Sequence, residues 1–480
     1  MMNKEMITCG EIIIEPFHLK EIHEIKINRK INEHVFFEAS GRIDEEDKDY
    51  YSHEINFGTE LVVKHTDGNI LFRGLLTQVE VKHQGAFYSV CIQGCSYTVL
   101  MDITEKTRPF HDVAKTYTDL FQWISSEYSG ANVIINDIYQ EEVQQLFMQY
   151  KETDWAFLKR LASQKSQGLF AGCTSIGPAY YAGTPNLHRD MNQSEGEFQV
   201  KKDLKSYKEA VESSEFAATD AGYITYTVCM ENWLDLGEEI TYRGMPLWVK
   251  SAYSVLEHAV LVHYYELCVK VGLYQKKAYN ELLSGISVKG VVRAVSRDCV
   301  KIQVEEKTNG QKVDKLTDQG AGWFPYSTVY ASKDGSGWYC MPEIGDKVRL
   351  IFPDSDEKNA YSTGSISEYQ PKSSEKDRMA DYKNRYIRNP QGMEVDWSPE
   401  QINISSNGAC VATLDQNGVL TLSAKSKIIL QSEGNIVIES GDQIKVNAAH
   451  SIQMICGGKG EINISKEGII ELKGNEVYTN

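Results

Sequence analysis

The chain lacks the features that mark membrane-inserted and zinc-stabilised proteins. Its first 18 residues, MMNKEMITCGEIIIEPFH, contain no apolar run of the length that a signal peptide or a membrane span requires. We therefore expect assembly in the cytoplasm without a signal peptide. The 10 cysteines are scattered with no CxxC pair, and the closest two, Cys91 and Cys95, have no partners at zinc-ligand spacing. Reduced, buried thiols are the interpretation that we favour.

Sequence motifs of common enzymes are also missing. No HExxH, GxSxG or GxxxxGK[ST] pattern occurs. His258 and His263 stand five residues apart in a run that we expect to be one strand, so they should face opposite sides of it. His450 is expected at a solvated corner rather than in a metal ring. We therefore predict a protein that is not an enzyme and that has no cofactor and no metal.

Clustered positive charge is the third absence. The chain has 50 Lys and Arg against 67 Asp and Glu, a formal net charge of −17 that is spread along the sequence. Three copies would carry −51 (3 × −17). Phosphate backbones and anionic membranes need clustered Lys and Arg on their partner, so we expect no nucleic-acid partner.

The C-terminal part of the chain does contain a regular pattern, an eight-residue repeat of apolar pairs. The first members of the pairs are Leu420, Ile428, Ile436, Ile444 and Ile452, and the second members are Leu422, Leu430, Ile438, Val446 and Met454. After the stretch CGGKGEINI the pair Ile462 and Ile464 follows at a step of ten, for which a bulge or widened turn is expected at residues 457–460. Each pair places two side chains on one strand face, and the polar spacers turn the chain. This pattern indicates a β-solenoid.

One such chain is too thin to enclose a core, because each repeat offers only two or three inward side chains. Three copies around a threefold axis would close a prism filled by these side chains and would leave no open strand edges. We therefore predict an intertwined triple-stranded β-helix over residues 401–480, with the twelve apolar residues above as its trimer core. The alternatives are a single-chain solenoid, which usually needs longer coils, and a folded hairpin stack.

The rest of the chain is predicted to be mainly β. Four parts are expected: a hub region over 1–285 with two β-barrel-like units and helices near 112–128 and 153–164, a compact β-module over 286–370, a charged linker over 371–400, and the repeats over 401–480. Either Thr153 or Asp154 can cap the second helix.

The β-module carries a family resemblance. Its landmarks are Gly290, Trp323, Pro325, Trp338, Pro342, Gly345, Phe352, Pro353 and Gly364. Together they resemble the OB-fold barrel of VgrG proteins and contractile-phage spike proteins, and the stretch QYKETDWAFLKRL at 149–161 looks like the hub signature of VgrG. Pro342 and Gly345 suit a turn that needs a fixed φ followed by a positive φ. The C-terminal repeat departs from the family because it lacks regular Val-x-Gly tripeptides.

The resemblance implies a trimeric hub and central spike of a contractile injection machine, whether phage tail, tailocin, extracellular injection particle or type VI secretion system. Its implied partners are a tail tube ring, baseplate proteins, a small tip-sharpening PAAR-like cap near Tyr478, possible effector cargo, and a target envelope on firing.

The alternative is a trimeric tailspike-like glycan hydrolase or receptor-binding protein, but the acidic residues are too evenly spread to nominate a catalytic pair. A third reading, an OB module that binds nucleic acid, lacks a basic stripe with interleaved aromatics.

Overall fold

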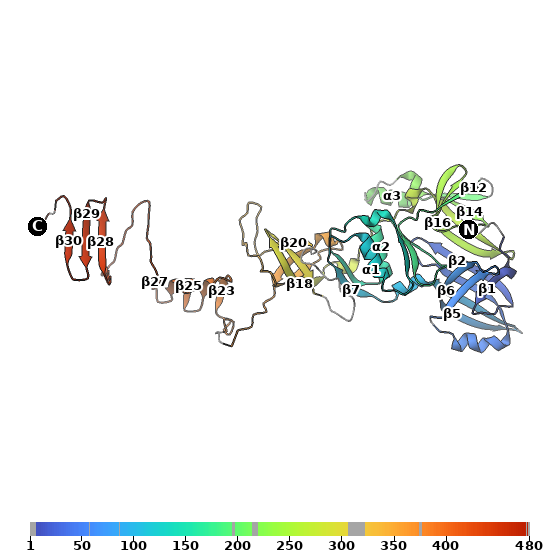
Figure 1. The fold of residues 1–480 in the computed structure, drawn as a ribbon, viewed down its shortest axis with the longest axis horizontal. Helices are drawn as coiled ribbons and strands as arrows, with labels where there is room; N and C mark the ends of the chain where they lie inside the picture. Colours follow the sequence, from blue (N-terminus) through green and yellow to red (C-terminus); the bar gives the residue numbers. More distant parts are fainter. Residues whose placement is uncertain are drawn as a thin grey trace. The chain divides into compact units, whose positions relative to one another are not determined.

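The computed structural model describes residues 6–56, 58–85, 87–193, 197–213, 219–305, 322–373, 377–476 and 478. The chain forms two compact units, Met1–Ser367 and Glu368–Asn480 (Figure 1). Within the described ranges no helix is both long and apolar enough to cross a membrane.

The hub is built on one large β-sheet with the strand order β1-β4-β5-β6-β3-β2-β16-β17-β14-β13, to which β15 and then β12 attach beside β16. These strands are β1 Ile12–Glu15, β2 Glu21–Lys30, β3 Phe36–Ile43, β4 Glu60–His65, β5 Ile70–Gln84, β6 Phe87–Ser96, β12 His188–Gln193, β13 Phe198–Lys202, β14 Ile224–Met230, β15 Glu239–Tyr242, β16 Met245–Glu257 and β17 Val260–Cys268. Buried and less buried residues alternate along β2 and β17, as expected for strands with one face on a core.

The two β-rich halves of the hub are present, and their strands belong to one continuous sheet. Antiparallel pairing of β2 with β16 joins them, with Lys30 opposite Ser251. A bridge between Thr8 and Val260 brings the start of the chain back to the β16–β17 hairpin. Each half keeps its own apolar core, one around Phe37 and the other around Tyr265. The sequence pattern could not reveal the shared sheet because residues far apart in the chain form the pairing.

In the sequence, helices and short strands separate the two halves. They are α1 Tyr117–Ser125 and α2 Asp154–Ser163, with β7 Lys106–Phe110, β8 Asn132–Ile135, β9 Phe147–Glu152, β10 Leu169–Ala171 and β11 Ala179–Ala182. Thr153 caps α2 by accepting from the Ala156 amide, as predicted. The first helix begins later than expected because Thr116 and Asp119 form a capping box. A third helix, α3 Leu204–Ser213, was not predicted, since it presents mostly charged and polar residues to solvent.

The OB module is a closed barrel with the strand order β18-β19-β20-β22-β21, as predicted. The strands are β18 Ser287–Ser296, β19 Cys299–Val304, β20 Trp323–Ser327, β21 Lys347–Ile351 and β22 Tyr361–Ser365. A Cβ on Gly290 would lie 2.3 Å from the Ile302 side chain, so the strands pack too closely there for any other residue. Gly345 has a φ of +98° in the turn before β21. That conformation is one that glycine adopts without strain.

The C-terminal unit consists of two antiparallel meanders. The first contains β23 Arg385–Arg388, β24 Met393–Trp397, β25 Gln401–Ser406, β26 Cys410–Asp415 and β27 Leu420–Ala424, and the second contains β28 Ser451–Cys456, β29 Gly460–Ser465 and β30 Ile470–Lys473. The stretch 371–400 is therefore not only a linker, because β23 and β24 lie in it. Their turn, Asn389-Pro390-Gln391-Gly392, was hidden among charged residues.

The hub and the OB barrel share a core. Leu146 and Met148, from the hub, pack in the same apolar cluster as Val300 and Phe352 of the barrel. Beside this cluster, Arg160 of α2 reaches Glu357 of the barrel at 2.5 Å and Glu152 of β9 at 2.9 Å. All three side chains are at most 10% exposed, and a buried ion triad of this kind fixes the geometry of its partners.

A second buried network holds the start of α2, just after β9. Asp154, fully buried at the start of α2, accepts from Arg108 at 2.6 Å and from Lys106 at 2.5 Å, and both cations also pair with Glu127. Tyr128 donates to the same Asp154 carboxylate at 2.7 Å. The strand and the helix that carry the OB barrel are therefore anchored on both sides.

Replacing Arg160 with Met is predicted to destabilise this joint strongly. Glu152 and Glu357 would remain buried without their cation, at a cost of about 3–5 kcal/mol. Urea denaturation of the full chain, followed by tryptophan fluorescence, measures the loss. The matched control is Lys159→Met on the same helix, which should change stability by less than about 0.5 kcal/mol. Equal midpoints for the two variants would contradict the role given to Arg160.

Candidate functional site

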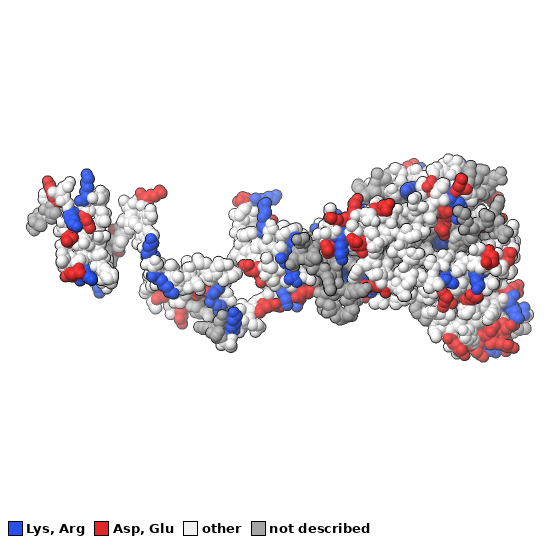
Figure 2. All heavy atoms as spheres, viewed as in Figure 1, with Lys and Arg blue, Asp and Glu red and all other residues white. Residues whose placement is uncertain are grey.

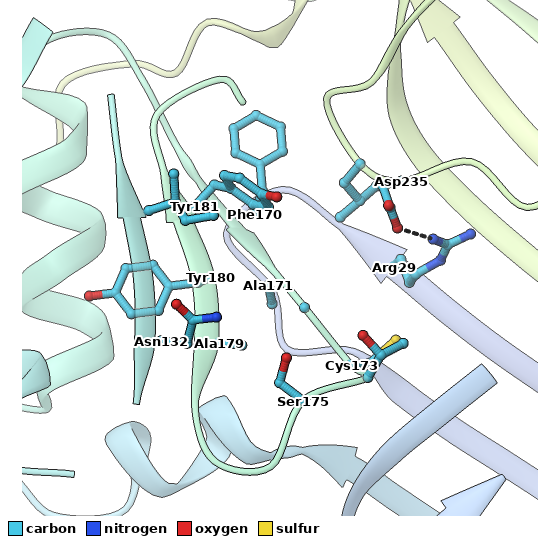
Figure 3. A pocket seen from close by; sticks show the side chains of 14 residues that line it. Arg29, Asn132, Phe170, Ala171, Cys173, Ser175, Ala179, Tyr180, Tyr181 and Asp235 are labelled. Atoms are coloured by element: carbon cyan, nitrogen blue, oxygen red, sulfur yellow. Dashed lines mark ion pairs between the residues drawn. The ribbon is translucent and has the colours of Figure 1, made fainter. Parts of the chain in front are cut away.

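The hub contains a small cavity that could have been a catalytic site. Its volume is about 160 Å³, and Figure 3 shows Arg29, Cys173 and Asp235 along its wall. Arg29 is 2% exposed; it donates to the Leu234 carbonyl at 2.8 Å, lies 3.8 Å from the Asp235 carboxylate and stacks 3.8 Å over the Trp233 ring. Burial raises the pKa of the Cys173 thiol to about 12, so it remains protonated. These contacts are structural, and the wall presents no activated nucleophile.

The histidines of the second half are also structural. His258 and Ala259, with φ of 49° and 65°, form the turn between β16 and β17, so the prediction that His258 and His263 share one strand was wrong. The error came from an apolar run that continues through the turn. His263 is buried and bonded through Nδ1 to Ser254 at 2.7 Å, and burial, with a smaller effect of Arg29, lowers its pKa to about 3. Within the described residues no group of three potential metal ligands is found.

The first meander of the C-terminal unit has one apolar face. The residues on this face, paired from strand to strand, are Ile387, Val395, Trp397, Ile402, Ile404, Ala412, Leu414, Leu420 and Leu422. The intervening residues, such as Asp396, Asn403 and Thr413, are polar, and they bond to one another across the opposite face. The strand register therefore gathers most of the large apolar side chains on one face, with Val411 and Tyr386 as exceptions on the other face.

The second meander repeats the arrangement. Its apolar face contains Ile452, Met454, Ile462, Ile464, Ile470 and Leu472. Gly457 and Gly458, both with positive φ, form the turn between β28 and β29, which accounts for the ten-residue step in the repeat. Several of these face residues were missed at the sequence level, although Ala412 and Leu414 stand eight residues before Leu420 and Leu422, and Ile470 and Leu472 stand eight after Ile462 and Ile464.

Ten of the twelve predicted trimer-core residues are largely exposed in the single chain. Their exposed fractions run from 40% at Ile462 to 68% at Leu430, and only Ile452 and Ile464 are half-buried. An uncovered apolar surface of this extent is typical of an interaction site rather than of a finished monomer surface. We use the term apolar face for these twelve residues together with the paired apolar residues of the two meanders, a set that runs from Ile387 to Leu472.

The middle of the repeat, residues 425–450, forms no strand in the single chain. From 426 to 450, a range that the structure describes throughout, no backbone amide donates to a backbone carbonyl. Yet Ile428, Ile436 and Ile444 continue the eight-residue spacing without a break. A segment with the pattern of strands but no strand partner leaves both its side chains and its backbone groups uncovered.

The OB signature residues serve different structural purposes. Phe352 is fully buried in the barrel core and Pro342 is buried beside the turn at Gly345, whereas Trp323 and Trp338 are about half exposed. The remaining members, Pro325, Pro353 and Gly364, lie at the surface, and Gly364 has a φ of +58°.

Comparison with known proteins identifies the module and the fold. Residues 288–366 match the family model described as the type VI secretion system/phage-baseplate injector OB domain. An E. coli component of the type VI secretion system, described as structurally similar to the bacteriophage T4 tail proteins gp27 and gp5, has a TM-score of 0.51 at 9% identity, covering 74% of this chain and all of that one. No curated protein matches the chain by sequence.

Two structures of a PdpA–VgrG complex share the fold as well. The lidded form, from Francisella, has a TM-score of 0.50 at 9% identity and covers 86% of this chain and 80% of that one. The lidless form has a TM-score of 0.50 at 8% identity and covers 84% and 93% of the respective chains. At such low identities these likenesses show a common fold.

Replacing Ile436 and Ile444 together with Asp is predicted to prevent assembly. Both side chains belong to the uninterrupted repeat, and burying them would bury several uncompensated charges at once. Val437→Asp is the matched control, because Val437 is already 70% exposed and points to the other side of the expected strand. Light scattering on each variant should show single chains for the double variant and a normal assembly for the control. Assembly of the double variant with unchanged heat resistance would mean that the two isoleucines do not face inward.

Proposed function

We propose that this chain, which has the fold and the OB domain of VgrG and phage tail hub-spike proteins, is the structural hub and central spike of a contractile injection machine. It would act as a homotrimer that joins the tail tube to a membrane-puncturing needle. The observation that carries the proposal is the apolar face, which has no cover within its own chain and follows directly after an injector-type OB barrel.

Sister copies are the cover that fits the apolar face. Three copies around one axis would turn their apolar faces inward, and each fully buried Ile or Leu would contribute about 1.5–3 kcal/mol. The backbone groups of residues 426–450 would find strand partners on neighbouring chains, as buried or semi-buried backbone groups require. Closure around the axis leaves no free strand edge in the needle.

A spike must transmit force without bending, and the hub–OB joint suits that task. The barrel is fixed to the hub by a shared core and by the Arg160–Glu357 pair, so load on the barrel passes directly into α2 and β9. A prism hydrogen-bonded from layer to layer is likewise stiff. The resulting mechanism needs no chemistry from the protein, and we propose that the chain is not an enzyme and binds no cofactor.

The proposed partners follow from the two ends of the assembly. Three hubs, each with two β-rich halves, would present six similar units to a sixfold tube ring and its baseplate. At the other end of the unit, Tyr478 is 84% exposed. A small tip-sharpening, PAAR-like cap would cover this end, with effector cargo as a further partner. Assembly would take place in the cytoplasm, and contraction would deliver the spike into the target envelope.

Light scattering on the purified full chain tests the trimer directly. Three chains of 54.3 kDa give an expected mass of about 163 kDa (3 × 54.3). The assembled species should be heat-resistant and should not release sugar from peptidoglycan or capsular polysaccharide. A folded monomer would contradict the spike proposal, and hydrolysis of polysaccharide would favour the tailspike-like alternative.

A further inference from the structure

One margin of the hub carries a dense group of carboxylates. The segment that follows β3, residues 44–54, contains a 3-10 helix, Glu45–Asp47, and a π-helix, Tyr50–Glu54. Its acidic residues are Asp44, Glu45, Glu46, Asp47, Asp49 and Glu54, against the single Lys48, which gives a net charge of −5 (−6 + 1). Figure 2 shows this acidic segment as a continuous red area. Lys48 forms an ion pair with Glu45 of the same segment, at 3.0 Å, so it does not neutralise the other carboxylates of the segment.

The edge strand β13 and the first turn of α3 have the opposite charge. Residues 198–208 contain Lys201, Lys202, Lys205 and Lys208 against Asp203, a net charge of +3 (+4 − 1) in a chain whose total is −17. The side chains of Lys205 and Lys208 are 88% and 77% exposed, and their partners Glu209 and Glu212 lie at 3.9 and 3.8 Å. Exposed pairs of this length contribute little, so these amines remain open to a stronger partner. We call residues 198–208 the basic edge.

An independent observation on β13 also points to a missing neighbour. It is the terminal strand of the hub sheet; it pairs with β14 on one side and has no strand on the other side within the described residues. All five of its residues are exposed, and two of them, Phe198 and Val200, are apolar. An exposed strand edge with apolar side chains is a surface that proteins normally cover.

The two patches lie on different sides of the hub. Figure 1 shows α3 along one margin and the blue helical segment after β3 along the opposite margin. Copies related by a threefold axis meet through heterologous contacts, in which one patch of each copy meets a different patch of the next. Two different patches of opposite charge on one copy are what such a head-to-tail contact requires.

We propose that the basic edge of each copy docks against the acidic segment of the next copy, in three equivalent contacts around the hub. This inference rests on the proposed homotrimer and adds the surface by which the hubs, as distinct from the spikes, recognise each other. A second copy is the occupant that the charges favour, because the same chain supplies −5 where the edge supplies +3. Such a contact would set the order of subunits and weaken as salt is raised.

Carbodiimide cross-linking of the full chain tests the contact, because this reagent joins a lysine amine directly to a carboxylate. Covalent dimers and trimers should appear on a denaturing gel. Mass spectrometry of these bands should find peptides from residues 198–208 joined to peptides from residues 44–54. Light scattering on the same sample establishes the trimer separately.

Charge reversal and charge exchange supply the controls. Lys201→Glu with Lys205→Glu should lower the yield of this cross-link by about tenfold, since two attractive pairs become repulsive. Adding Glu45→Lys and Glu46→Lys to the same chain should restore it. Lys151→Glu with Lys333→Glu, on exposed residues outside both patches, should leave the yield unchanged.

The outcomes separate the two proposals. A trimer whose covalent dimers lack the 198–208 to 44–54 link, or whose link survives charge reversal, would overturn this contact and leave the spike function standing. A monomer by light scattering would overturn both. The same link found only in monomer bands would mean a contact within one chain and would also overturn the inference.

Discussion

The proposed assembly depends on an apolar face that is largely exposed within the described part of its own unit. In each meander of the C-terminal unit, strand pairing puts most Ile, Leu and Val residues on one side and mainly polar residues on the other, with Val411 and Ile455 as exceptions. A β-sheet needs a second layer over its apolar side, and a single chain of this length provides none. We propose that the cover comes from other chains, since a trimeric prism would supply it with the same side chains three times. In this proposal the hub and the OB barrel would form the base of the spike.

The base is built for rigidity by a different kind of interaction. Its critical elements, β9 and α2, carry buried ion networks on both sides, with Asp154 in one network and Arg160 in the other. Buried ion pairs add little net stability compared with apolar packing, but they enforce one geometry, because any shift leaves a charge without its partner. The hub thus fixes the direction of the barrel, whereas in the proposed trimer the apolar face would determine how many chains come together. The acidic segment and the basic edge would add a third level, the order of subunits around the ring.

Much of the fold could be predicted because short stretches of the sequence determine it. The OB barrel is marked by residues with fixed backbone roles, such as Gly290 and Gly345, and α2 by the capping residue Thr153. Part of the apolar face was predicted, because the eight-residue spacing of its apolar pairs can be seen in the sequence whatever the strand pairing. Features set by distant pairing were not predicted: the β2–β16 joint, the Arg160–Glu357 pair and the bridge from Thr8 to Val260. Two turns could not be predicted from the local sequence. The turn at Gly392 stands among charged residues, and the turn at His258 stands within an apolar run.

Hydrogen–deuterium exchange of the assembled particle tests the central claim most directly. Within the part of the chain that the structure describes, the amides of residues 426–450 donate to no backbone carbonyl, so we expect strong protection to come from neighbouring copies. The account predicts that peptides spanning Ile428, Ile436 and Ile444 exchange as slowly as the buried strands of the OB barrel. Exchange of these peptides at the rate of an unfolded chain, in a particle of trimer mass, would contradict it.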